Sequence, residues 1–134
     1  MTPVALLTDR TVTHYAGGAL FRASGMPLYV VGVSGQPSHR FHDHDFTELI
    51  VVTKGRGRHA TDRDEYAIGT GDVFVIHPKE QHSYRDTEGL TLYNVFFDPV
   101  GLQLPLLDLE RSPGYRALFT LEPRLRASHG FRSR

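Results

Sequence analysis

The sequence contains no cysteine and no tryptophan. Without cysteine the chain can form no disulfide framework and no thiolate site, which fits a reducing compartment. No apolar stretch approaches the roughly 20 residues that a membrane-spanning helix needs. The first ten residues lack the charged-then-apolar layout of a secretory signal. We therefore expect a cytoplasmic protein with no membrane partner.

The chain also lacks any net charge at pH 7, so no overall charge attracts it to nucleic acid. The charge is nevertheless uneven, because six Arg and a single acidic residue, Glu122, lie between Arg111 and Arg134. Apolar residues and two prolines are interleaved with these arginines. We favour a packed, solvated surface for this segment, with a functional basic face as the alternative. Because no recognition-helix pattern is present, we expect no sequence-specific DNA binding by this chain alone.

Thirteen Gly and eight Pro in 134 residues indicate many turns and few long helices. Several apolar runs carry apolar residues at both parities, as a sandwich or closed barrel requires. We also expect a hairpin around Gly55, returning over Arg58–Thr61, and a short strand at Glu65–Ile68. Helical periodicity appears only around Leu102–Leu107 and Tyr115–Leu121. The fold class is all-β, and the clearest predicted strands are Leu28–Val33, Phe46–Val52, Asp72–Ile76 and Leu90–Phe97.

Histidine and glutamate recur at a spacing that can build a metal site. On an extended chain His42, His44 and Glu48 project to one side. A second block, launched by the Gly71-Asp72 turn, brings the chain back at His82. Three imidazoles and one carboxylate suit one divalent ion such as Zn, Ni, Fe, Mn or Co. The alternative is a polar pocket that holds an organic ligand through the same side chains.

These blocks resemble the two motifs of the cupins. His42, His44, Glu48 and Gly55 match the core of the first motif, and Gly71 and His82 match the second. Lys79 replaces the second motif's middle glycine, and Asp86 replaces its final asparagine. Neither departure removes a ligand. The resemblance implies a cupin jelly roll (a double-stranded β-helix), with a short helical or irregular C-terminal segment.

A closer resemblance covers most of the chain. The stretches His44–Leu49, Gly71–Ile76, Gln81–Tyr84 and Leu92–Asp98 are similar to the N-terminal sensor domain of AraC-type transcriptional regulators, and within these to the rhamnose-operon regulators. The resemblance implies one cupin domain over residues 1–134. Its barrel would span about residues 1–110, and residues 111–134 would lead toward a linker and helix-turn-helix units. We expect the chain to be part of a longer regulator, with a stand-alone cupin as the alternative.

Ligand contacts are predicted at Tyr84, Asn94, Phe96 and Arg40. Tyr84 shares parity with His82, and Arg40 precedes the metal strand with His39, near the barrel mouth. On Leu92–Phe97 either the even or the odd positions face inward, so Asn94 is a ligand contact in one case and faces water or caps a bulge in the other. His77 is expected at the rim. Arg56, Arg58 and His59 are expected to face solvent.

The predicted function is effector sensing. The barrel would bind a small polar ligand, with a sugar as the favoured class, and the metal would orient its hydroxyl groups. The alternative is a metal-dependent cupin enzyme such as a dioxygenase, isomerase or epimerase. A homodimer is left open.

Overall fold

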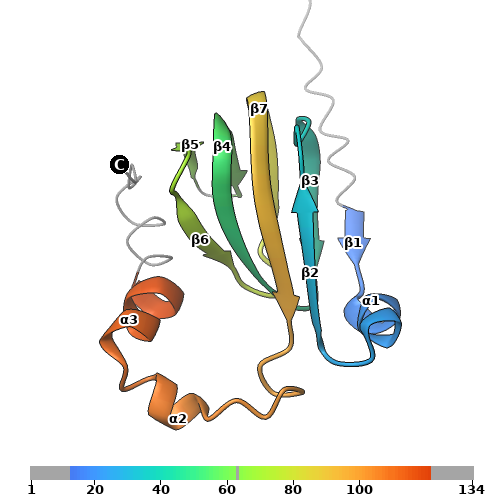
Figure 1. Ribbon diagram of the computed structural model, residues 1–134, viewed down its shortest axis with the longest axis vertical. Coiled ribbons are helices and arrows are strands. Elements are labelled where there is room, and N and C mark those ends of the chain that lie inside the picture. Colours follow the sequence, from blue (N-terminus) through green and yellow to red (C-terminus); the bar gives the residue numbers. More distant parts are fainter. Residues whose placement is uncertain (1–12, 63, 122–134) are drawn as a thin grey trace, which may run out of the picture.

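The computed structural model describes residues 13–62 and 64–121. The ends of the predicted domain, including most of its C-terminal segment 111–134, therefore lie outside the described residues. The elements, in chain order, are β1 (Thr13–Tyr15), α1 (Gly17–Ser24), β2 (Leu28–Val33), β3 (His39–His44), β4 (Thr47–Thr61), β5 (Glu65–Gly69), β6 (Val73–Ile76), β7 (His82–Phe97), α2 (Leu106–Leu109), α3 (Pro113–Arg116) and the π-helical turn η1 (Ala117–Leu121) (Figure 1).

Two long antiparallel strands, β4 and β7, organise the sheet. The first half of β4 pairs with the second half of β7, and β2 and β6 flank this pair. The second half of β4 pairs with the first half of β7, and β3 and β5 flank it, with β1 parallel to β3. Each long strand therefore contributes to both halves of one curved sheet. This arrangement is the predicted all-β jelly roll.

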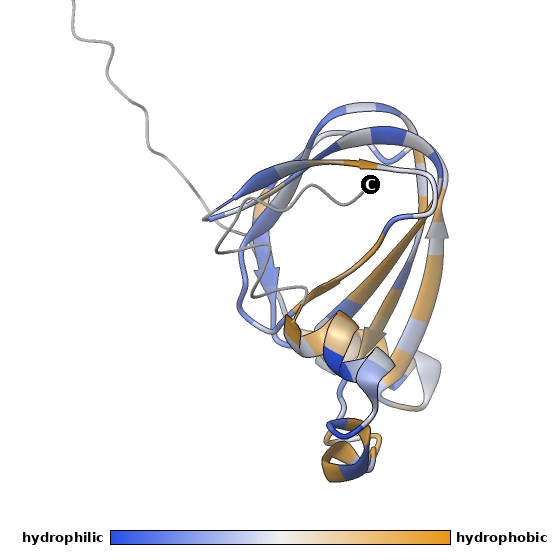
Figure 2. Ribbon diagram, turned by 90° about the vertical axis from the view of Figure 1, so that its left-hand side faces the viewer, coloured by the Kyte–Doolittle hydropathy of each residue, from blue (hydrophilic) through white to orange (hydrophobic). Residues whose placement is uncertain are grey.

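The core lies between the two halves of the sheet. Its buried cluster comprises Ile50, Val52, Tyr66, Ile68, Phe74, Ile76, Tyr84, Leu90 and Leu92. Apolar residues concentrate in the strands beside the C-terminal helices, and the opposite wall is richer in polar residues (Figure 2). The fold thus combines one apolar wall with one more polar wall, and the two enclose the site described below.

The predicted strand Leu28–Val33 is present with the same bounds, and the other predicted strands lie within or overlap β4, β5, β6 and β7. The hairpin predicted around Gly55 is wrong, because β4 continues through it from Thr47 to Thr61. Gly55 instead adopts a φ of 75° in a stretch where the pairing register of β4 with β7 shifts. A β-carbon there would lie 2.3 Å from the carbonyl oxygen of Gly89. Glycine at this position lets a bulge form inside a long strand.

The bulge changes which residues of β4 face inward. Before it, the buried positions that face the core are even-numbered, as at Ile50 and Val52. After it, the side chain of His59 is buried, an odd-numbered position. The register of β4 with β7 shifts three times between Val52 and Arg58, and at the first shift two residues of β4 (Val52 to Lys54) advance against one residue of β7 (Leu92 to Thr91). One extra residue therefore exchanges the two faces of the strand.

The N-terminal elements β1 and α1 were not anticipated from the sequence. The backbone N–H of Gly17 donates to the Asp45 carboxylate at 2.7 Å, which anchors the start of α1. Phe21 of α1 packs edge-on against Phe46, with ring centroids 5.8 Å apart. Gly25 ends the helix in the left-handed conformation with a φ of 74°. These contacts hold β1 and α1 beside the β3–β4 connection.

The C-terminal helical region docks on β6 and β7. Phe119 of η1 meets Phe97 edge-on, with ring centroids 6.2 Å apart, and stacks on Tyr115. The Nε2 atom of His77, just beyond β6, lies 3.0 Å from the carbonyl oxygen of Phe119 and donates to it. His77 thus contacts the C-terminal region. Among the described helices, none is long and apolar enough to cross a membrane.

Replacing Gly55 by alanine should destabilise the protein more than the same change at Gly25. The two residues have almost the same φ, so each substitution costs about 1 kcal/mol for the left-handed backbone. A β-carbon at Gly25 meets no atom within 4 Å, whereas at Gly55 it collides with backbone. We expect Gly55→Ala to cost about 2 kcal/mol or more beyond Gly25→Ala in urea unfolding. Equal losses would show that β4 is not held tightly against β7 at this point.

Candidate functional site

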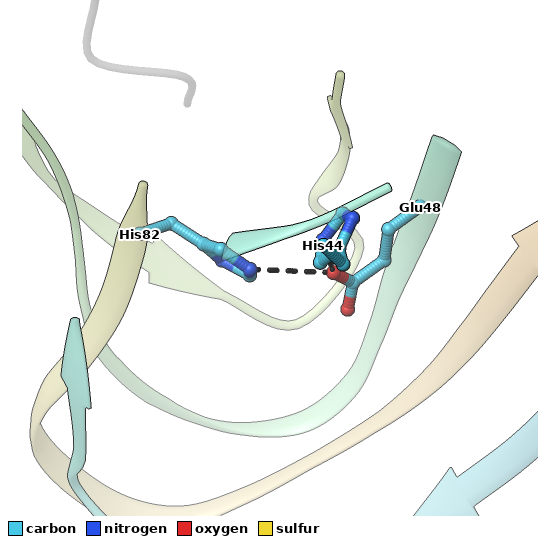
Figure 3. Close-up of side chains that lie close together, drawn as sticks. All are labelled: His44, Glu48 and His82. Atoms are coloured by element: carbon cyan, nitrogen blue, oxygen red, sulfur yellow. Dashed lines mark hydrogen bonds and ion pairs between the residues drawn. The ribbon is translucent and has the colours of Figure 1, made fainter. Parts of the chain in front are cut away.

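Two histidines and a glutamate converge from three strands inside the barrel. His44 ends β3, Glu48 lies near the start of β4, and His82 begins β7. Figure 3 shows the three side chains pointing toward one another. One nitrogen or oxygen atom from each lies within 4.8 Å of the others. The sheet brings them together. At His82, β7 pairs with β3, and the second half of β7 pairs with the stretch of β4 that contains Glu48.

The three side chains are almost fully buried, with exposed fractions of 2% for His44, 4% for Glu48 and 0% for His82. The Nε2 atom of His44 lies 2.7 Å from Oε2 of Glu48, and Nε2 of His82 lies 3.3 Å from the same oxygen. On its other side, Nδ1 of His44 lies 2.7 Å from the carbonyl oxygen of Phe46. A carbonyl only accepts, so Nδ1 carries a proton. A proton or a metal ion must then lie between Nε2 and the carboxylate, since both would otherwise present lone pairs.

The electrostatics keep Glu48 ionised. Burial alone would raise its pKa. The hydrogen bond with His44, the approach of His82 and the charge on the two imidazoles outweigh burial and lower the pKa of Glu48 to about 2. A buried carboxylate of this kind needs a cation beside it. The site therefore supplies one negative charge and two imidazoles to whatever occupies it.

These residues fit a divalent metal ion. Among the described residues, Nε2 of His82 is a buried nitrogen with no hydrogen-bond partner of good geometry. It faces Glu48 at 3.3 Å, near the roughly 3.4 Å that separates two ligands of a tetrahedral zinc ion with bonds of about 2.1 Å. Two imidazoles and a carboxylate suit Zn, Fe, Mn, Co or Ni. His44, Glu48 and His82 would hold the ion, which would act as a Lewis acid toward a bound ligand.

His42, the fourth predicted ligand, lies beside this group without belonging to it. Its ring centroid is 4.1 Å from that of His82, and its Nδ1 donates to the carbonyl oxygen of Arg40 at 3.1 Å. Burial, followed by the charge on His82, lowers the pKa of His42 to about 4. His42 is therefore neutral at pH 7. Its role as a ligand stays a prediction.

A cavity of about 290 Å³ opens beside two of the converging side chains, His44 and Glu48. Three of the four predicted ligand contacts line it, namely Tyr84, Asn94 and Phe96, and the fourth, Arg40, is exposed and is not part of its wall. The remaining wall is formed by Tyr15, Ala16, Leu20, Gln36, His39, His42, His44, Phe46 and Glu48. The even positions of Leu92–Phe97 thus face inward. Whether the four predicted residues contact a ligand stays a prediction.

Two buried polar atoms in the cavity wall have no partner among the described residues. They are the hydroxyl oxygen of Tyr84 and Oδ1 of Asn94. Burial, and then the charge of Glu48, raises the pKa of Tyr84 well above its usual value, so its hydroxyl keeps its proton. Buried polar groups are rarely left unpaired. Tyr84 can donate and Asn94 can accept, which are the two roles that a hydroxyl-bearing ligand needs.

The expectation that His59 faces solvent is wrong. Its exposed fraction is 0%, whereas Arg56 and Arg58 form the surface ion pairs expected of outward residues. Nε2 of His59 lies 3.0 Å from Nδ1 of His82, and its Nδ1 lies 2.7 Å from the Tyr66 hydroxyl. The signal in the sequence was Gly55, read as a hairpin turn. Read as a bulge, it would have placed His59 on the inner face.

Comparison with known proteins agrees with this architecture. The family model described as the AraC-like ligand binding domain matches residues 28–131. This chain belongs to that family. The match includes all three converging residues and Tyr84, Asn94 and Phe96. The cupin sensor domain that the sequence motifs predicted is therefore confirmed at the level of the family.

Curated relatives include the HTH-type transcriptional activator RhaR of Escherichia coli K12, which is 40% identical over 76 residues. RhaR of Shigella flexneri serotype 5b matches at the same identity. The matched region is 57% of this AraC-like domain and 27% of either relative. The chain thus spans about a quarter of the length of these relatives.

Solved structures with a similar course include protein NMB1881 from Neisseria meningitidis, at 15% identity and a TM-score of 0.48, with 54% of this chain and 75% of that chain covered. A cupin-2 domain containing protein from Shewanella frigidimarina has 21% identity and a TM-score of 0.44, covering 53% and 69%.

The depressed pKa of His42 predicts a loss of stability in acid. The unfolded chain takes up a proton near pH 6.5 and the folded chain only near 4, so stability falls as the pH drops from 6.5 to 4. The largest loss in the free energy of unfolding from this group is about 3 kcal/mol. We expect His42→Gln to remove most of that loss when unfolding is measured in chelator at pH 7, 5.5 and 4. Parallel pH profiles for the two proteins would contradict the buried, neutral state of His42.

Proposed function

We propose that this domain is the effector-binding sensor of a longer transcriptional regulator and that it binds a small polar molecule in its barrel, a sugar in the favoured case. The cavity with the unpaired Tyr84 hydroxyl and the unpaired Asn94 carbonyl carries the proposal. A volume of about 290 Å³ lies at the small end of ligand pockets. A sugar carries several hydroxyl groups, each of which can donate and accept, so it can offer a partner to each of these atoms.

The aromatic part of the wall favours a ligand with apolar faces as well. Phe46 and Phe96 line the cavity and meet edge-on, with ring centroids 4.9 Å apart. Ligand pockets commonly join such apolar surface to a few oriented polar groups. Pentoses and deoxyhexoses combine C–H faces with hydroxyl groups. They are the first compounds to test.

The proposal extends to a divalent ion held by His44, Glu48 and His82, with His42 as a fourth ligand. Two observations support it. Nε2 of His44 faces the Glu48 carboxylate with something needed between their lone pairs, and Nε2 of His82 has no hydrogen-bond partner of good geometry among the described residues. When bound, the ion would orient ligand hydroxyls that reach it from the cavity. The protein's own residues contribute the shape of the cavity, the donor at Tyr84 and the acceptor at Asn94.

The regulatory role rests on the family and on the named relatives. An AraC-like ligand binding domain beside a DNA-binding unit would link effector binding to DNA binding in the full protein. We propose that residues 111–134 lead toward that unit, and that this chain alone does not bind DNA specifically. A cytoplasmic location and a homodimer stay predictions.

A metal-dependent enzyme remains the second candidate. Three protein ligands beside a cavity would leave open positions on a bound ion, as catalytic sites do. The two functions differ in outcome, because an enzyme converts the compound that it binds. A sugar recovered unchanged after long incubation with metal-loaded protein favours the sensor.

Ligand binding should raise the melting temperature, since a ligand that binds only the folded state stabilises it. We expect at least one pentose or deoxyhexose to do so in a thermal-shift screen. Tyr84→Phe should weaken binding of that sugar about fivefold to tenfold, through loss of one hydrogen bond. Tyr93→Phe is the matched control, because Tyr93 lies on the same strand but is exposed. Equal affinities for wild type and Tyr84→Phe would remove Tyr84 from the binding site.

Protein purified without an affinity tag should hold about one divalent ion per chain by elemental analysis. His44→Ala and His82→Ala should each lose the ion and stay folded, because neither histidine is a member of the apolar core cluster. His14→Ala, at an exposed histidine, is the control. Occupancy should fall below about pH 6.5, where protons compete for imidazole. Protein that stays metal-free after incubation with Zn²⁺, Ni²⁺, Mn²⁺ and Fe²⁺ would contradict the metal site.

A further inference from the structure

A row of three buried side chains runs across the inner face of the sheet and ends at His82, one of the three residues that could hold a metal ion. Tyr66 on β5, His59 on β4 and His82 on β7 are all almost fully buried. His59 pairs with Tyr66 across one edge of β4 and with Tyr84 across the other, and Thr61 pairs with His82. His59 and His82 are therefore diagonal neighbours on adjacent strands.

The row is joined by two hydrogen bonds. Nδ1 of His59 lies 2.7 Å from the Tyr66 hydroxyl, and Nε2 of His59 lies 3.0 Å from Nδ1 of His82. The His59 ring is also packed against Phe74, with centroids 4.6 Å apart. Both nitrogens of His59 are thus used inside the protein. Its orientation is fixed by the hydrogen bonds at its two ring nitrogens.

The direction of these hydrogen bonds follows from what His82 does at its far side. To bind a cation, Nε2 of His82 must present a lone pair, so its proton must be on Nδ1. Nδ1–H then donates to Nε2 of His59. His59 in turn carries its proton on Nδ1 and donates it to the Tyr66 oxygen. Each nitrogen in the row has a partner in this arrangement.

We propose that His59 and Tyr66 are positioning residues that orient His82 and fix its tautomer for metal binding. The inference rests on the metal site of the proposed function and adds two residues to it. Metal-bound histidines commonly donate their second ring N–H to a carboxylate, carbonyl or water. Here a second histidine, itself held by a tyrosine, takes that place. The metal affinity of the site therefore depends on a hydrogen bond two residues away from the ion.

Zinc affinity measured by chelator competition tests this arrangement. His59→Leu should weaken Zn²⁺ binding about 10–100-fold, because Nδ1–H of His82 loses its acceptor. His59→Gln, whose side-chain oxygen can accept the same proton, should recover most of the loss. Tyr66→Phe keeps the ring and should cost about fivefold. Phe74→Leu is the matched control, since it disturbs the packing around His59 without removing a hydrogen bond, and its Zn²⁺ affinity should equal that of wild type.

Nuclear magnetic resonance of protein with ¹⁵N-labelled histidine rings provides a readout that a packing defect does not move. In the Zn²⁺-loaded protein, both His82 and His59 should carry their proton on Nδ1. A proton on Nε2 of His59 would overturn the proposal, as would wild-type affinity in His59→Leu or an equal loss in Phe74→Leu. If wild-type protein binds no Zn²⁺, the metal site itself fails and the positioning role fails with it. If Zn²⁺ binds but the His59 variants match wild type, only the positioning role fails.

Discussion

The pairing of β4 with β7 is the constraint on which the site depends. Both strands run through the two halves of the sheet, so the same two backbones position the apolar core and the polar wall. Glu48 comes from the first half of β4 and His59 from the second. His82 and Asn94 come from the two ends of β7. A change in the register of this one pair would separate the carboxylate from its imidazoles.

The bulge at Gly55 makes that pairing compatible with a polar wall. Without an added residue, the alternation set by Ile50 and Val52 would turn His59 toward solvent. Arg56 and Arg58 instead lie outside, and the imidazole between Tyr66 and His82 lies inside. The irregular stretch of β4 around Gly55 therefore decides which side chains face the interior. Lys79 and Asp86, where the chain departs from the cupin motif, also have positive φ. They keep the backbone shape that the motif's glycine and asparagine favour.

The sequence predicted much of the fold because its signals were local. Strong apolar runs such as Leu28–Val33 gave correct strands, and the spacing of His44, Glu48 and His82 identified residues that do converge. The inward face of the Asn94 strand could not be decided from the sequence, and the burial of His59 was missed because Gly55 was read as a hairpin turn. They depend on register and on one bulge, which are set by pairing across the sheet. β1 and α1 were missed because their helix is short, glycine-rich at its start and held by tertiary contacts with Asp45 and Phe46.

The alternation along β7 has a mechanical consequence at its C-terminal end. Phe96 lines the cavity, whereas the next residue, Phe97, lies on the other side of the strand against Phe119 of η1. A single peptide unit separates these two rings. A single strand therefore separates the cavity on one side from the packing surface of the C-terminal helical region on the other. If an occupant displaced the strand at Phe96, the contact of Phe97 with Phe119 would move with it, because no other layer of described residues lies between them.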